Sequence, residues 1–190
     1  MNPTAPPDIQ ALEDAFDTVE RDARALVAGL TEEQGTWRAE PGSWSVSECL
    51  DHLATGNRVY LDAMRPSADR AVARKRGRRG PALPGFLGRQ FVKWLEPPVK
   101  PRLKGKAPKT IRPRPSPPLA ESASQFLESL DDVRAFLRTY AGTDLAGVGF
   151  PNPFIRGVRW SLATGLHILA AHARRHLWQA RRVAHKRSIL

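Results

Sequence analysis

Four long segments repeat apolar residues every three or four positions, and no segment of useful length alternates apolar and polar residues. The three-to-four spacing gathers apolar side chains along one face of an α-helix, whereas alternation would indicate a half-buried strand. The four segments cover approximately residues 8–30, 45–65, 119–140 and 158–186. The sequence therefore predicts an all-α fold, a four-helix bundle that forms a single domain over residues 1–190.

The second predicted helix has a start signal and a stop signal. Ser45 and Glu48 form an S-x-x-E capping box, which satisfies free backbone N–H groups at a helix start. Trp44, just before this box, is expected to pack against the first turn as a staple residue. Pro66 predicts the end of the helix, because proline lacks a backbone N–H. The predicted buried stripe consists of Val46, Leu50, Leu53, Asn57, Tyr60 and Met64.

A basic, proline-rich insertion, at about residues 65–118, separates the second and third predicted helices. Residues 65–114 contain 16 Lys or Arg and two acidic residues, so this stretch carries +14 and the rest of the chain about −3, against a total of +11. Residues 85–95 (GFLGRQFVKWL) predict a short amphipathic helix, and the remainder predicts a solvated linker. Deleting most of residues 68–112 should then leave the four helices folded. A connection of this length also lets the second and third helices run parallel.

Composition narrows the class of protein. No stretch reaches 18 apolar residues, and the N-terminus lacks the pattern of a signal peptide, so we expect a soluble cytoplasmic protein without a membrane partner. Cys49 is the single cysteine, which excludes an internal disulfide and a cysteine-rich zinc site. It is expected to be a small buried apolar residue.

The last predicted helix carries two histidines at chelating distance. His172 and His176 are four residues apart, so their side chains project from one face, one turn apart, on the flank of the apolar stripe. Gln179 lies on the same side, whereas His167 and His185 lie roughly 140–180° away on the helical wheel. The pair is compatible with half of a metal site or with two polar residues on a basic helix surface. Ala173 stands where the metalloprotease motif H-E-x-x-H has Glu, which disfavours a protease.

A third ligand would have to come from another helix. His52 is the only histidine outside the last predicted helix, and it lies just beside the apolar stripe of the second. It is compatible with a metal ligand or with a hydrogen-bonded histidine on a helix flank. Gly56 near His52, and Gly165 near His172, are expected to leave room between the helices for an ion and a substrate.

Two motifs resemble those of a known family. "WSVSECLDHL" (residues 44–53) resembles the W-S-x-x-E-x-L-x-H-L opening of the second helix in DinB/YfiT-like proteins. "HILAAHARRHLWQARR" (residues 167–182) is similar to their final-helix motif H-x-x-x-H-x-x-Q. The resemblance covers the four predicted helices but not the insertion. It implies that His52, His172 and His176 hold a divalent metal ion, often zinc or nickel, with positions left open for water or substrate.

The resemblance also suggests an activity. Several DinB-like relatives are thiol-dependent S-transferases or isomerases that use a low-molecular-weight thiol, and members often form homodimers. A bound metal could activate such a thiol, or activate water for hydrolysis. The sequence does not identify a general base. Glu48 and Asp51 are compatible with positions behind the metal ligands or at the surface, and we expect solvated carboxylates. Gln179 is compatible with a hydrogen bond within the site or with a surface position.

A non-enzymatic function is the alternative. The clustered cations of the insertion would attract nucleic acid or an acidic partner without sequence selectivity. Phe91 and Trp94, which lie among them, could stack on bases, although we expect them to pack onto the bundle.

Overall fold

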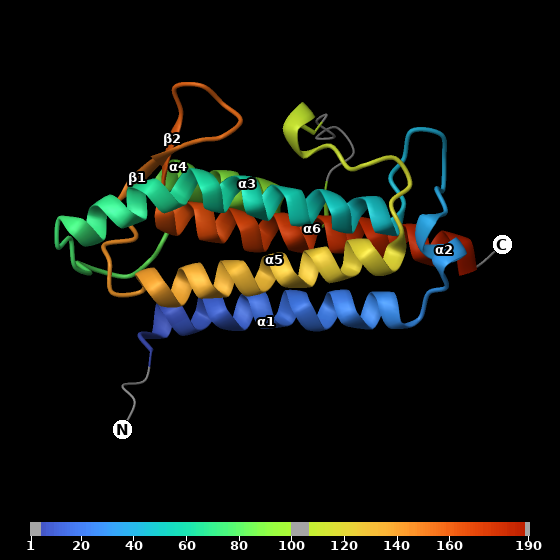
Figure 1. Ribbon diagram of the computed structural model, residues 1–190, viewed down its shortest axis with the longest axis horizontal. Coiled ribbons are helices and arrows are strands. Elements are labelled where there is room, and N and C mark those ends of the chain that lie inside the picture. Colours follow the sequence, from blue (N-terminus) through green and yellow to red (C-terminus); the bar gives the residue numbers. More distant parts are fainter. Residues whose placement is uncertain (1–4, 100–106, 189–190) are drawn as a thin grey trace.

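Four long helices form the body of the protein. The structure is a computed structural model that describes residues 5–99 and 107–188. The long helices are α1 (Pro7–Ala28), α3 (Val46–Ala73), α5 (Leu119–Tyr140) and α6 (Leu162–Ser188). They lie side by side along the long axis of the molecule; α1 and α6 run in one direction, and α3 and α5 in the other (Figure 1). The prediction of an all-α fold is confirmed.

The apolar faces of these helices meet in one continuous core. Every member of the predicted stripe of α3 is buried. The largest side chains with almost no exposed surface come from all four long helices and from the segment before α6: Phe16, Leu50, Leu53, Met64, Phe126, Phe136, Leu137, Phe150, Leu162 and Leu166. This packing fixes the rotation of each helix about its axis, and it therefore fixes which side chains lie between the helices.

Helix α3 begins as the sequence predicts and ends later. The Ser45 hydroxyl accepts a hydrogen bond from the Glu48 N–H at 3.2 Å, and the Glu48 carboxylate accepts one from the Ser45 N–H at 2.9 Å. The prediction that Pro66 ends the helix is wrong, because α3 continues to Ala73. Pro66 is exposed, whereas Ala68 and Ala71 in the following turn are buried. We attribute the continuation to this burial, which offsets the hydrogen bond lost at proline.

Short elements fill the connections. They are α2 (Glu32–Thr36), α4 (Phe86–Leu95), the 3₁₀ helix η2 (Lys109–Ile111), β1 (Gly149–Pro151) and β2 (Arg159–Ser161). The two strands pair antiparallel, with Phe150 opposite Trp160. No strand was expected from the sequence, because three residues are too few for alternation to be recognised. Since residues 159–161 belong to β2, the last helix begins at Leu162 and not at residue 158.

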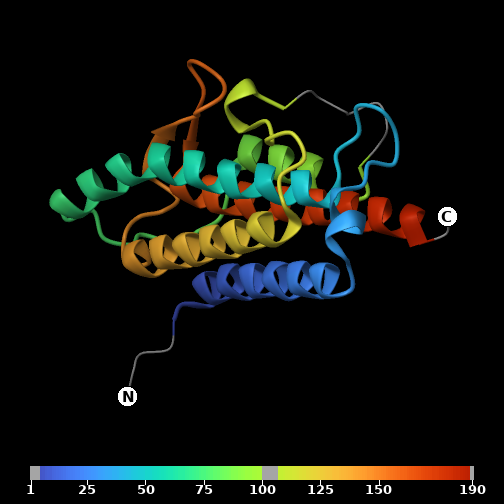
Figure 2. The same cartoon turned by 45° about the vertical axis from the view of Figure 1, so that its right-hand side comes forward.

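The segment between α3 and α5 is more than a solvated linker. Residues 65–73 belong to α3, and α4 packs along α6, where it appears in green in Figure 2. Helix η2 packs against α3. Ala82, Leu95 and Ile111 are buried, at 1%, 7% and 4% exposure. The expectation that residues 68–112 are dispensable therefore conflicts with the structure. Four cations of the predicted basic insertion, at positions 100, 102, 104 and 106, lie outside the described residues.

A helix needs about 20 predominantly apolar residues to cross a bilayer. Within the described ranges, no helix is both long enough and apolar enough to do so.

Candidate metal centre

Three histidines converge between the start of α3 and the middle of α6. His52 lies in the second turn of α3, and His172 and His176 lie in successive turns of α6. One ring nitrogen of each lies within 4.8 Å of the corresponding atom of the other two. His52 Nε2 and His172 Nε2 are 3.0 Å apart. His52 and His176 are buried, and His172 is partly exposed.

Hydrogen bonds orient two of the three imidazoles. His52 Nδ1 lies 2.5 Å from the main-chain oxygen of Ile111, and His176 Nδ1 lies 3.1 Å from Gln179 Oε1. Carbonyl oxygens only accept hydrogen bonds, so both Nδ1 atoms must carry the proton. In the neutral ring, Nε2 then keeps its lone pair. Metal-binding histidines characteristically donate their other N–H in this way.

Burial keeps the three rings neutral. It lowers the pKa of His52, although the bond to Ile111 and the nearby Asp51 carboxylate oppose the effect. Burial also lowers the pKa of His172 and His176 well below the usual range, and the neighbouring histidines and Arg175 lower both further. Neutral imidazole is the form that binds metal ions. Three neutral nitrogen donors suit zinc or nickel better than a hard cation such as magnesium, so the residues present fit the ion that the motifs imply.

Trp44 forms one wall of the cluster. The centroid of its ring system lies 4.7 Å from that of His52 and 5.5 Å from that of His176. The sequence pattern predicted only a staple role for Trp44, at the start of α3. Trp44 is the first residue of the W-S-x-x-E motif, and this position could have indicated that it lies at the site.

The two carboxylates next to His52 are buried and ion-paired, so the expectation of solvated side chains is wrong. Glu48 and Asp51 are each 3% exposed. Asp51 accepts hydrogen bonds from the main-chain N–H of Arg114 at 2.9 Å and from its Nε at 2.8 Å. Arg38 Nε donates to Glu48 at 2.9 Å. Burial alone would raise the pKa of Glu48, but the bonds from Arg38 and Ser45 outweigh it and lower the pKa.

Only one of the two glycines lies where the sequence analysis expected it. A Cβ on Gly56 would lie 3.5 Å from His172 Cε1, so Gly56 does border the cluster. A Cβ on Gly165 would instead lie 2.8 Å from Met64 Sδ and 3.0 Å from the Phe150 ring. Gly165 therefore allows α6 to approach the core and does not provide room for a substrate.

The other candidate residues lie elsewhere, as predicted. His167 Nε2 lies 3.1 Å from the carbonyl oxygen of Ala82, on the far side of α6, and His185 is exposed. Cys49 is fully buried, and burial raises the pKa of its thiol, so it is not a nucleophile. Phe91 stacks on Trp94 and on Trp160, with ring centroids 5.6 Å apart in each pair. These rings contact one another, as expected, although Trp94 remains 40% exposed.

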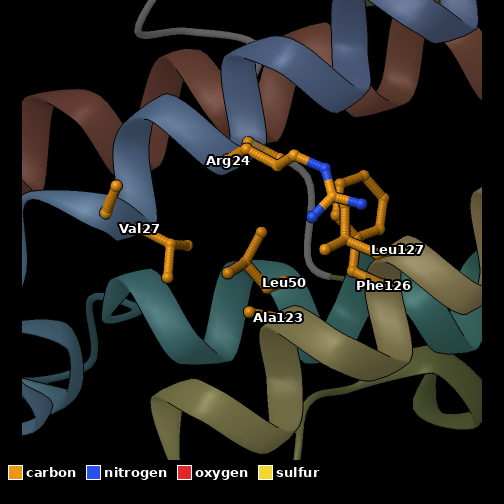
Figure 3. Close-up of a pocket in the computed structure, with 8 residues that line it drawn as sticks. Arg24, Val27, Leu50, Ala123, Phe126 and Leu127 are labelled. Atoms are coloured by element: carbon orange, nitrogen blue, oxygen red, sulfur yellow. The ribbon is translucent and has the colours of Figure 1, made fainter.

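A separate apolar cleft lies between α1, α3 and α5, with a cavity volume of about 300 Å³. Figure 3 shows Val27 and Leu50 on one side of it and Leu127 on the other, with the Arg24 side chain across it. None of the three clustered histidines lines this cleft, so it is not the access route to the candidate metal centre.

Comparison with known proteins identifies the family. The model of a family described as the DinB superfamily matches residues 15–180, a range that contains all three clustered histidines. No curated protein and no solved structure matches the chain.

Proposed function

The chain belongs to the DinB superfamily, and from this premise we propose that it is a divalent-metal-dependent enzyme whose ion is held by His52, His172 and His176. The observation that carries the proposal is the convergence of three neutral imidazoles, two of which have Nε2 left unprotonated by hydrogen bonds at Nδ1. Three protein ligands leave coordination positions for water or substrate, as in catalytic rather than structural metal sites.

The helices support the same assignment. We interpret α1, α3, α5 and α6 as a DinB-like four-helix bundle, with the chain between α3 and α5 as its long crossover. This topology supplies one histidine from the first half of the chain and two from the last helix.

We propose thiol transfer as the reaction, with hydrolysis as the second candidate. A divalent ion held by three neutral histidines would lower the pKa of a coordinated thiol or water molecule. Hydrolysis generally also needs a general base within hydrogen-bond reach. Among the described residues, the two carboxylates next to His52 are already bonded to Arg38 and Arg114. A small thiol ionises more easily than water and needs less help from a base, which favours an S-transferase.

The chain's own residues would have three tasks. Ile111 and Gln179 hold the protons on the Nδ1 atoms, which orients two of the rings. Trp44 covers one side of the cluster and excludes water there. The partly exposed side at His172 is where substrate would enter.

Elemental analysis of protein purified without a histidine tag or added metal is the direct test. We expect close to one equivalent of zinc or nickel per chain, and conjugation of a small thiol to an electrophile that stops on chelation and returns with metal. Protein that takes up no divalent metal would refute the proposal. Metal uptake together with ester or amide hydrolysis, and no thiol transfer, would favour the hydrolase.

We also expect a homodimer, as is frequent in DinB-like proteins. Light scattering coupled to size-exclusion chromatography measures the mass directly, against 21.1 kDa for one chain.

A further inference from the structure

Helix α4 is apolar on both of its faces. Its inner face packs on α6: Leu95 is buried, and a Cβ on Gly88 would lie 2.7 Å from the Thr164 side chain. Its outer face exposes Phe86 (69%), Leu87 (71%) and Trp94 (40%). Large apolar side chains are rarely this exposed together on a soluble surface, and such groups usually mark an interaction site.

The side of this outer face around Phe86 is positively charged. At 100° per residue, Arg89 and Lys93 lie within about 60° of Phe86 on the helical wheel, and both are exposed. Among the described residues, neither makes an ion pair or a side-chain hydrogen bond. Helix α4 contains no acidic residue, and Glu96, directly after it, is bonded to Arg174. The partner of this face must therefore supply negative charge and an apolar environment together.

A second copy of the chain does not meet this requirement. Two α4 outer faces in contact would bring Arg89 and Lys93 of one copy against the same cations of the other. A large protein partner is also a poor match. A ten-residue helix is about 15 Å long and 10–12 Å wide, so it offers far less than the roughly 800 Å² that each side of a standard interface buries.

Nucleic acid is disfavoured because two of the three aromatic rings of α4 are already engaged. One face of Trp94 stacks on Phe91, and the Arg175 guanidinium lies 5.3 Å from its ring centroid. Phe91 stacks on Trp160 as well. The two most exposed apolar side chains, Phe86 and Leu87, gain little from a hydrated phosphate backbone.

We propose that the outer face of α4 binds the surface of an anionic lipid bilayer. Phe86 and Leu87 would enter the boundary between headgroups and acyl chains, and Arg89 and Lys93 would contact lipid phosphates, as in interfacial amphipathic helices. The sequence pattern alone predicts no membrane contact, because it shows no spanning segment. A helix that lies on the surface of a bilayer does not need a spanning segment. This proposal is independent of the metal centre.

Cosedimentation with lipid vesicles tests it, using the full chain at low salt. Wild-type protein should bind vesicles of equal parts phosphatidylglycerol and phosphatidylcholine, and should bind pure phosphatidylcholine much more weakly. The double variant Phe86→Ser/Leu87→Ser should lose binding. Arg89→Gln/Lys93→Gln should weaken it about 25-fold, since each surface cation contributes about fivefold. All four side chains are exposed, so these variants should keep the wild-type circular dichroism spectrum.

Ile155→Ser is the matched control, because Ile155 is 48% exposed but lies in the turn between β1 and β2. It should bind as wild type does. Equal affinity of wild type and the Phe86/Leu87 variant would overturn the proposal, as would equal affinity for neutral and anionic vesicles. A wild-type dimer that the Phe86/Leu87 variant dissociates would assign the face to a second copy. Binding of an oligonucleotide that the same variant abolishes would assign it to nucleic acid.

Discussion

His52 Nδ1 donates a hydrogen bond to the main-chain carbonyl of Ile111 at 2.5 Å, although 59 residues separate them in the sequence. Arg114, three residues further on, anchors the same segment to α3, because its main-chain N–H and its guanidinium both bond to Asp51, the residue before His52. The basic connection between α3 and α5 therefore completes the candidate metal centre from outside the helices.

Arg114→Ala should weaken metal binding without unfolding the protein. Loss of the guanidinium loosens residues 109–114, so the Ile111 carbonyl no longer fixes the orientation of His52. Loss of a comparable supporting bond typically costs 10- to 100-fold in metal affinity. Competition with a chromophoric chelator would measure the metal affinity of the variant. The control is Arg112→Ala, which removes the same charge from the same segment. Arg112 is exposed, and within the described part of the chain its side chain bonds only to the Ala107 carbonyl. If both variants bind metal equally well, the supporting role of Arg114 is wrong.

Replacing each histidine in turn should distinguish the three clustered histidines from His167 and His185 by the effect on metal content. His52→Ala, His172→Ala and His176→Ala should each lose most of the bound metal after dialysis, because two ligands hold an ion far less tightly than three. His167→Ala and His185→Ala should keep wild-type metal content, since neither belongs to the cluster. Elemental analysis of the five variants gives the comparison. Equal metal content in all five would return His172 and His176 to the interpretation as polar residues on a basic helix.

The sequence predicts the long helices and the pairing of His172 with His176 well, because both depend on periodicity. The addition of His52 to this pair depended on the resemblance to DinB/YfiT-like proteins. An apolar stripe fixes which side of α6 faces inward, and the angles relative to that stripe separate His172 and His176 from His167 and His185. The start of α3 is equally local, because the capping box needs only residues 45–48.

The errors concern interactions between residues distant in sequence. Glu48 and Asp51 look solvated until Arg38 and Arg114 are seen to bond them. Pro66 would end an isolated helix, but the buried side chains after it continue α3. The Ile111 carbonyl is a main-chain group, so the residue type at this position gives no indication that it bonds to His52. Composition suggested a linker between α3 and α5, and only the contacts with α3 and α6 show that this segment is packed.

The metal-free protein should lose stability as the pH falls below about 6.5. Burial lowers the folded-state pKa of His52, His172 and His176. In the unfolded chain these groups titrate near 6.5, so below that pH the unfolded chain takes up protons that the folded chain does not. The free energy of unfolding should therefore fall between about pH 6.5 and the lower folded-state pKa, and it should be insensitive to these groups above pH 7.

Urea denaturation at a series of pH values measures this dependence. His167 is also buried with a lowered pKa, so it contributes with the same sign. His172→Ala should show a shallower dependence than wild type, whereas His185→Ala should match wild type. Added zinc should raise stability most near neutral pH, where the three rings are already unprotonated. A profile that is flat from pH 7 to pH 5 would contradict the assigned pKa shifts.

Two glycine substitutions should have opposite effects on stability. Gly165→Ala forces a Cβ against Met64 and Phe150 and should destabilise the protein by about 1–3 kcal/mol, as overpacked cores do. Gly56→Ala meets only ordinary contact with His172 and removes a flexible residue from α3, so it should be neutral or stabilise by up to about 1 kcal/mol. Urea denaturation compares the two, and equal destabilisation would contradict the different surroundings of these glycines.

A pair of leucines in α4 tests whether the segment between α3 and α5 belongs to the folded core. Leu95 is 7% exposed against the core, and Leu87, two turns earlier on the same helix, is 71% exposed. Leu95→Ala should lower the free energy of unfolding by about 2–4 kcal/mol, because it leaves a cavity, whereas Leu87→Ala should change it by less than about 0.5 kcal/mol. Both substitutions remove the same atoms from the same helix, so differences in helix propensity cancel. If α4 were part of a solvated linker, the two variants would unfold at the same urea concentration as wild type.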